Sequence, residues 1–323
     1  MKPDLIVNFG GPRDLEEIAP FLRALLTDRD VIRTRFPKFF HNWLFGRVAE
    51  KRAGKIRHDY EKIGGKSPIY SDTEALAQKI GALTFHRYLP ATHRESLEKI
   101  EACGADQIRV IPLFPQFSYA TTGSIARFFQ ANLSRATLNK LRWVHSYAVH
   151  PAFVAAYQRR VREFLEEKKI EEGNCVLLFS AHGVPRSFID SGDIYESDCQ
   201  NSFEAVRRAF PKATARLSYQ SKFGPGEWLR PYTDESCEEI LSWCEEKKQA
   251  VIVPISFTSD HIETLFEIEE LYLPILQGKG VEAYRCPALN LEEHWIEAIQ
   301  NIRETSPLCG TEMLVRNPRS HGF

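Results

Sequence analysis

One histidine and a row of glutamates stand out as the side chains of this sequence that could do proton or metal chemistry. His182 follows the apolar run of residues 175–179 and is itself followed by a turn. A second apolar run leads through another turn into three glutamates at the spacing of one helical face: Glu263, Glu267 and Glu270. Histidine nitrogen and carboxylate oxygen bind iron and its transition-series neighbours, and both accept protons. The residue types therefore predict proton transfer or divalent-metal binding where these two runs end.

Part of this pattern also has a structural explanation. Asp260 and Glu263 have the D-x-x-E spacing of a capping box, and acids are favoured in the first turn of a helix. The later glutamates need another explanation, because no Lys or Arg occurs from residue 249 to 278 and like charges at helical spacing cost about 0.2 to 0.5 kcal/mol per pair. A divalent cation or a proton relay would supply the missing positive charge. On the residues alone, two loops would bring His182, His261 and Glu263 together, and the reaction stays open.

The elements that position these residues follow from an alternation of short apolar runs with longer helical patterns, which predicts an α/β fold with parallel sheets. Strands are expected at residues 5–8, 83–86, 109–113, 141–144, 176–180, 215–219 and 250–257. Helices are expected at residues 14–26, 73–80, 125–133, 152–168, 195–209 and 236–247. Ligands bind beyond the carboxyl ends of strands in such sheets, where His182 is placed, although a lone loop histidine is more often structural.

The length of the chain suits two α/β domains, since it has 323 residues of which 43% are hydrophobic. A boundary is expected at residues 150 and 151, where a strand pattern gives way to a long amphipathic helix. This predicts domains 1–150 and 151–323, the second carrying His182 and Glu263, with the last helix a candidate to pack back on the first domain.

Composition and missing motifs exclude several classes of protein. The formal charge of -1 attracts no nucleic acid, and seven scattered cysteines without metal spacing are typical of a reducing cytoplasm. The sequence shows no signal peptide and no run of about 18 apolar residues, so neither export nor membrane spanning is expected. Gly10–Pro12 lies in no nucleotide-binding motif and Ser180 in no G-x-S-x-G elbow, so neither nucleotide binding nor serine hydrolysis is expected.

Residues 29–66 depart from the α/β pattern. They contain eleven Lys or Arg against four acids, and large apolar side chains are interleaved with the bases: Phe36, Phe39, Phe40, Trp43, Leu44 and Phe45. Such a mixture suits a membrane surface or a flat anionic ligand. An ordinary helix with an aromatic face in the core and a solvated basic face explains it equally well.

Seven strings of the sequence, in this order, closely resemble ferrochelatases: VNFGGP, LLTDRDVIR, GGKSPI, PQFSYATTGS, SAHGVP, YQSKFGPGEWLRPYTDE and FTSDHIETLFEIE. The resemblance covers the chain from about residue 4 to about residue 300. It implies two Rossmann-like domains with parallel sheets and a porphyrin cleft between them, as in class II chelatases. It also implies an enzyme that inserts Fe²⁺ into a porphyrin to form haem.

The resemblance assigns roles to individual positions. It places His182 and Glu263 on opposite faces of the porphyrin as catalytic and metal-contacting residues. It implies a path for protons or metal through Asp260, His261 and Glu267. It implies pocket positions at Phe9, Lys62, Gln220, Ser221, Lys222 and Trp228. Residues 29–66 correspond to the family's lip over the pocket mouth, where peripheral contact with a membrane is expected.

The resemblance constrains two points less: which porphyrin is the substrate, and whether His182 or the carboxylates accept the protons. Phe9 stands where methionine is typical of members acting on protoporphyrin and tyrosine of those acting on coproporphyrin, and its N-x-GGP context favours protoporphyrin IX over coproporphyrin III. With a reference pKa of about 6.5, His182 would be neutral near pH 7 and could accept a pyrrole proton. The reverse assignment, with His182 as iron ligand and the carboxylates as base, stays open.

Ferrous iron is expected as a substrate, and no tightly bound cofactor is expected. The C-terminal tail has only Cys309, and Tyr119 stands where an internal cysteine ligand can sit, so no [2Fe-2S] cluster is expected. The expected location is the cytoplasm, peripheral to the inner membrane. The alternatives are a carrier that binds haem or porphyrin without turnover, and a chelatase for a corrin or sirohydrochlorin precursor.

Overall fold

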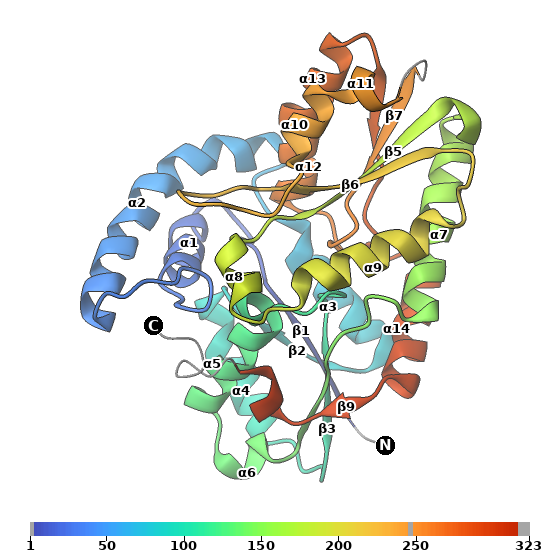
Figure 1. Ribbon diagram of the computed structural model, residues 1–323. Coiled ribbons are helices and arrows are strands. Elements are labelled where there is room, and N and C mark those ends of the chain that lie inside the picture. The colour runs from blue at the N-terminus through green and yellow to red at the C-terminus, as the bar shows by residue number, and fades with distance from the viewer. Residues whose placement is uncertain (1–2, 245–247, 316–323) are drawn as a thin grey trace. The chain divides into compact units, whose positions relative to one another are not determined.

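The computed structural model describes residues 3–244 and 248–315, which form an α/β fold with two separate sheets (Figure 1). The chain divides into two units, residues 1–146 with 303–323 and residues 147–302. The change of unit lies between Ser146 and Tyr147, and the sequence predicted it after residue 150. The predicted fold class, α/β with mainly parallel sheets, is confirmed. Within the described ranges, no helix combines the length and the apolar character needed to cross a bilayer.

The first unit is built on a five-stranded sheet in the order β2-β1-β3-β4-β9. Its strands are β1 (Asp4–Asn8), β2 (Leu83–His86), β3 (Ile108–Pro112), β4 (Leu141–Val144) and β9 (Leu308–Cys309). The first four are parallel, whereas β9 is antiparallel to β4. The sequence did not predict β9, because two residues are too few to show a period.

Helices in this unit are α1 (Ile18–Leu26), α2 (Lys38–Lys62), α3 (Pro68–Ile80), α4 (Pro90–Glu101), α5 (Ser124–Asn132) and α6 (Arg135–Leu138), with a π-helix at Tyr119–Gly123 and a 3₁₀ turn at Thr311–Leu314. The helix predicted from residue 73 begins at Pro68 instead, because proline at the first helical position presets φ. It ends at Gly81, whose φ of 69° suits glycine. Phe85, Phe129 and Trp143 are fully buried in the core, with ring centroids 4.7 and 5.8 Å apart in succession.

The second unit is built on an all-parallel, four-stranded sheet in the order β6-β5-β7-β8. Its strands are β5 (Cys175–His182), β6 (Thr214–Gln220), β7 (Gln249–Val253) and β8 (Glu282–Arg285). Its helical segments are α7 (Pro151–Glu167), η2 (Glu172–Asn174), α8 (Arg186–Asp190), α9 (Tyr195–Arg207), α10 (Thr233–Glu238), α11 (Ile240–Cys244), α12 (Ile262–Leu265), η3 (Glu267–Tyr272), α13 (Leu273–Gly278) and α14 (Glu293–Thr305). Every residue of β5 before His182 is buried, as expected of a central parallel strand.

Two boundaries in this unit differ from those predicted. The strand predicted to reach residue 257 ends at Val253, because Pro254 follows and cannot donate a ladder hydrogen bond. The single helix predicted over residues 236–247 consists of α10 and α11, and residues 245–247 lie outside the described ranges. The shortened β7 leaves residues 254–261 free to form the loop that leads into α12.

Candidate active site

His182 is the last residue of β5 and lies in register with Gln220, the last residue of β6. Its backbone N–H donates to Ser256 Oγ at 2.9 Å, and its Nδ1 lies 2.5 Å from the Gly183 carbonyl oxygen. Because a carbonyl only accepts, Nδ1 carries the proton in this bond and leaves Nε2 for chemistry. Glycine is required next, since a Cβ on Gly183 would lie 2.8 Å from the Gln220 carbonyl oxygen.

Glu263 lies between two histidines. Its Oε1 is 3.5 Å from His182 Nε2 and its Oε2 is 3.3 Å from His261 Nε2. The His182 side chain is 36% exposed, that of Glu263 30% and that of His261 15%, so the group is partly shielded and still reachable from solvent. The loop after β5 and the segment after β7 therefore bring His182, His261 and Glu263 together. The 3.5 Å contact leaves no space for a ring between His182 and Glu263 in the ligand-free protein, so their placement on opposite faces of a porphyrin requires this pair to separate and stays a prediction.

The two charged partners shift each other's pKa in opposite directions. Burial lowers the pKa of His182. The charge and hydrogen bond of Glu263 and the charge of Glu267 outweigh this effect and raise the pKa to about 9. Burial raises the pKa of Glu263, but His182 and His261 lower it more, well below its usual range. At neutral pH these shifts favour an imidazolium and a carboxylate in the ligand-free protein, whereas the reference pKa favours a neutral His182.

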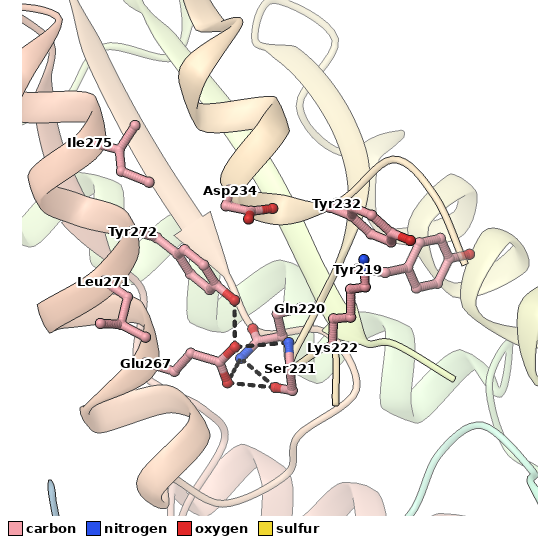
Figure 2. Close-up of a pocket in the computed structure, with 10 residues that line it drawn as sticks. All are labelled: Tyr219, Gln220, Ser221, Lys222, Tyr232, Asp234, Glu267, Leu271, Tyr272 and Ile275. Atoms are coloured by element: carbon pink, nitrogen blue, oxygen red, sulfur yellow. Dashed lines mark hydrogen bonds between the residues drawn. The ribbon is translucent and has the colours of Figure 1, made fainter. Parts of the chain in front are cut away.

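Glu267 is held by donors from Ser221, which follows β6, and from its own π-helix. Its carboxylate accepts from Ser221 N at 2.8 Å, from Ser221 Oγ at 2.5 Å and from Tyr272 Oη. Burial and the charge of Glu263 nevertheless raise the pKa of Glu267 above its usual value. Figure 2 shows these side chains converging on Glu267 at the edge of a cavity of about 340 Å³, which is also lined by Lys222, Asp234, Leu271 and Ile275 among others.

The backbone that carries the glutamates corrects two predictions. The capping box at the start of α12 joins His261 and Thr264, not Asp260 and Glu263, and His261 N donates to Thr264 Oγ1 at 3.0 Å. The glutamates do not share one face of a single α-helix, because α12 has only four residues and the π-helix η3 begins at Glu267. A π-helix is frequent at functional sites, and it changes the spacing at which side chains meet.

Arg285 on β8 supplies positive charge that the local sequence lacks. Its Nη1 lies 2.8 Å from Asp260 Oδ1 and its Nε lies 2.7 Å from Glu269 Oε1. Thr264 and Asn290 also donate to the Asp260 carboxylate, each at 2.8 Å. The prediction that the later glutamates of this segment have no cationic partner is therefore wrong for Glu269, because the cation comes from another strand. That Asp260 belongs to a proton or metal path stays a prediction.

We expect Arg285→Ala to lower the free energy of unfolding by about 3 kcal/mol, because it leaves the buried Asp260 carboxylate without its cation. Both partners are shielded, with side-chain exposures of 12% and 9%. Arg186→Ala is the matched control, since Arg186 is 44% exposed where it pairs with Glu196, and such pairs contribute less than about 1 kcal/mol. Urea unfolding of the wild type and both variants measures the loss of unfolding free energy. Equal losses in the two variants would show that the Arg285–Asp260 pair stabilises the fold no more than an exposed pair does.

The predicted pocket positions belong to both units. Ser221 binds Glu267, and Trp228 is 7% exposed and packs against Gly183, its Cε3 lying 3.5 Å from where a Cβ would be. Phe9 belongs to the first unit, where its ring meets that of Tyr88 edge-on at 4.5 Å. Lys62, also in the first unit, is the exposed last residue of α2.

The basic and aromatic segment contains α2, and it leaves the aromatic side chains around the start of this helix largely unburied. Phe36, Phe39 and Trp43 are 43%, 77% and 59% exposed. Phe40 meets Phe36 edge-on at 5.1 Å and stacks on Trp43 at 5.7 Å. The alternative of an ordinary helix with its aromatic face in the core is therefore wrong for this end of α2. We call Phe36, Phe39, Phe40 and Trp43 the aromatic patch.

Sequence reasoning missed several residues that build the site. Arg285, Asn290 and Ser256 carried no local signal, because each acts through a partner that is distant in the sequence. Tyr272 could have been noticed, since it follows the glutamate row within the same segment. Across the described ranges, no three or more His, Cys, Asp or Glu side chains are arranged to hold a metal ion.

Comparison with known proteins identifies the family. A family model described as Ferrochelatase matches residues 5–306. The chain is 42% identical over 319 residues to a protein named ferrochelatase from Chlamydia caviae, covering 97% of this chain and 98% of that one. It is 43% identical over 309 residues to a ferrochelatase from Chlamydia trachomatis serovar A, covering 94% and 95%.

Two solved structures share the fold. SirB from Bacillus subtilis with Fe³⁺ matches with a TM-score of 0.53 at 14% identity, over 95% of this chain and 96% of that one. DR2241 from Deinococcus radiodurans, described as similar to chelatases, matches with a TM-score of 0.51 at 12% identity, over 95% of this chain and 57% of that one. The fold is thus that of class II chelatases. Since the family model and the two chlamydial relatives span nearly the whole sequence, the chain belongs to the ferrochelatase family of enzymes.

Proposed function

We propose that this chain inserts Fe²⁺ into protoporphyrin IX to form haem, with His182 and Glu263 at the reacting centre. The observation that carries the proposal is the close pairing of an imidazole and a carboxylate at the carboxyl end of β5, at 3.5 Å, in a chain of this family. Iron is a substrate here. Ser221 and Trp228 remain proposed porphyrin contacts, as do Phe9 and Lys62 of the first unit.

The protonation of the pair limits how the reaction starts. Metal insertion requires the porphyrin to lose its pyrrole protons, and an imidazolium cannot accept one. An approaching Fe²⁺ lowers the pKa of His182, because like charges disfavour the charged form. We propose that His182 thereby becomes neutral and can accept a pyrrole proton or bind the iron, and both assignments stay open. Asp260, His261 and Glu267 are the proposed path for protons or metal on the Glu263 side.

The choice of protoporphyrin IX over coproporphyrin III is tested by the substrate itself. Purified protein is incubated anaerobically with Fe²⁺ and each porphyrin, and kcat/KM is measured from the loss of porphyrin fluorescence. We expect kcat/KM to favour protoporphyrin IX by at least about tenfold. A polar group of the substrate that finds no partner in the pocket changes the binding free energy by more than about 1 kcal/mol. A preference of that size for coproporphyrin III would make the chain a coproporphyrin ferrochelatase instead.

We also propose peripheral membrane contact through the aromatic patch. Bases flank the patch, including Arg35, Lys38 and Arg47, and aromatic side chains with nearby cations suit an anionic bilayer surface. Phe39→Ser with Trp43→Ser should weaken co-sedimentation with phosphatidylserine-containing vesicles by at least about tenfold, and added salt should weaken the wild type.

The matched control for the membrane proposal is Leu241→Ser, which removes another exposed apolar side chain, 53% exposed, from the second unit. Its vesicle binding should equal that of the wild type. Equal binding by the patch variant would instead remove the patch from any membrane contact. The location in the cytoplasm, the lack of a tightly bound cofactor and the lack of a [2Fe-2S] cluster stay predictions.

A further inference from the structure

Gln220 is a buried amide whose two ends bind different parts of the second unit. The residue is 2% exposed. Its Oε1 accepts from Ser180 Oγ at 2.7 Å, and its Nε2 donates to the backbone carbonyl of Glu263 at 2.7 Å and to Glu267 Oε2 at 3.3 Å. A backbone carbonyl accepts only, so the NH₂ end must face Glu263 and the oxygen must face Ser180. The orientation of the amide is therefore determined by its partners.

The carbonyl of Glu263 needs an outside donor. The last carbonyls of a helix have no intrahelical partner, and α12 consists of only four residues, Ile262–Leu265, before the π-helix begins. Gln220, the last residue of β6, supplies a donor at this junction. Figure 2 shows its side chain beside Glu267. It thus connects the strand end that lies in register with His182 to the segment that carries Glu263 and Glu267.

The oxygen end of the amide is supported by a chain of buried hydroxyls. Thr233 Oγ1 lies 2.9 Å from both Ser180 Oγ and Ser218 Oγ, and Ser218 Oγ donates to the Phe179 carbonyl at 3.2 Å. Ser180, Ser218 and Thr233 are fully buried. Hydrogen bonds in series polarise one another, which strengthens the donors at the far end of the amide.

We propose that Gln220 is a positioning residue for metal insertion. This proposal rests on the proposed function. It acts through Glu263, by holding the backbone of that residue so that its carboxylate stays paired with His182. It also supplies one of the donors that keep the neighbouring Glu267 in place. A displacement of about 1 Å in a reacting group can lower the rate about a hundredfold, so the loss of this donor reaches the chemistry through Glu263.

The test replaces Gln220 by Met, which has similar length but cannot donate. We expect kcat for iron insertion to fall by at least about tenfold while KM for porphyrin changes by less than about threefold. We also expect the titration midpoint of His182, followed by its ring NMR signal, to fall below that of the wild type, because Glu263 is no longer held 3.5 Å from it. This second readout needs no turnover, so it tests the positioning of Glu263 even if the proposed function fails.

Gln158→Met is the matched control. Gln158 is also partly buried in the second unit, and its Nε2 donates to the Ala205 carbonyl at 3.0 Å. The same substitution there removes a side-chain to backbone bond of the same kind, and we expect neither kcat nor the His182 midpoint to change. Wild-type values of both quantities in Gln220→Met, or equal losses in the two variants, would overturn the proposal.

Gln220→Glu provides the conservative variant, and it serves if Gln220→Met does not fold. A carboxyl group buried beside Glu267 ionises only at raised pH, and its protonated form can still donate to the Glu263 carbonyl. The ratio of variant to wild-type kcat should therefore fall as pH rises from about 6 to about 8, as the side chain loses its proton. A ratio independent of pH would argue against a role for the donated hydrogen bond.

Discussion

His182→Ala should lower the rate of iron insertion by at least about a hundredfold while leaving the fold and most of the porphyrin affinity intact, because it removes the side chain that accepts the proton or binds the iron. The loss should be confined to chemistry, since the imidazole makes few packing contacts and is 36% exposed. Single-turnover insertion, porphyrin titration by fluorescence and circular dichroism measure the three properties separately.

His58→Ala is the control for this prediction, since His58 is 72% exposed on α2 and lies 3.9 Å from the Glu61 carboxylate. It should insert iron at the wild-type rate. If His182→Ala instead fails to fold, His182 is the hydrogen-bonded structural histidine that its loop position alone would suggest. Wild-type insertion by a folded His182→Ala would exclude the residue from the reaction.

Glu263→Gln should slow insertion by a similar factor, at least about a hundredfold, although the side chain keeps its size. The substitution removes the negative charge that pairs with His182 and so removes the main cause of the raised pKa. The His182 midpoint should therefore fall well below that of the wild type, since the charge of Glu267 and the bond to Gly183 remain as the groups that oppose burial in the variant. NMR titration of the ring protons follows this change directly.

The same pair contributes to stability over a defined range of pH. The pKa of His182 is raised on folding, so its contribution is present below its unfolded pKa and is lost as pH rises through about 9. The pKa of Glu263 is lowered on folding, so its contribution is lost on the acid side. The stability difference between wild type and Glu263→Gln should thus be largest between about pH 4.3 and pH 6.5, the unfolded pKa values of Glu and His, and shrink towards both ends.

Glu269→Gln is the control for this variant, because Glu269 is a neighbouring acid that is 45% exposed and paired with Arg285. It should leave both the insertion rate and the His182 midpoint unchanged. An unchanged midpoint in Glu263→Gln itself would mean that the 3.5 Å contact does not control the protonation of His182.

Features with a local cause were predictable from the sequence. Short segments rich in apolar residues mark the strands, so β2 and β4 were predicted with their observed bounds and β5 to within two residues. The placement of His182 followed as well, because a parallel strand that ends in glycine and proline delivers its last side chain to the carboxyl edge of the sheet.

Features that depend on distant partners were not predictable from the sequence. The acidic row read as uncompensated because Arg285 lies 25 residues from Asp260, on a strand too short and too polar to be recognised. The transition from α12 to the π-helix has no sequence signature, so the spacing of Glu263 and Glu267 was assigned to a regular helix. The raised pKa of His182 likewise follows from tertiary contact and not from residue type.

The most direct test of the account is multiple-turnover assay of the wild-type protein, incubated anaerobically with excess Fe²⁺ and protoporphyrin IX. The account predicts that porphyrin fluorescence falls and the haem spectrum grows well beyond one equivalent of haem per protein. Binding of porphyrin without conversion would contradict it, and would make the chain a porphyrin carrier in which the pairing of His182 with Glu263 has no catalytic use.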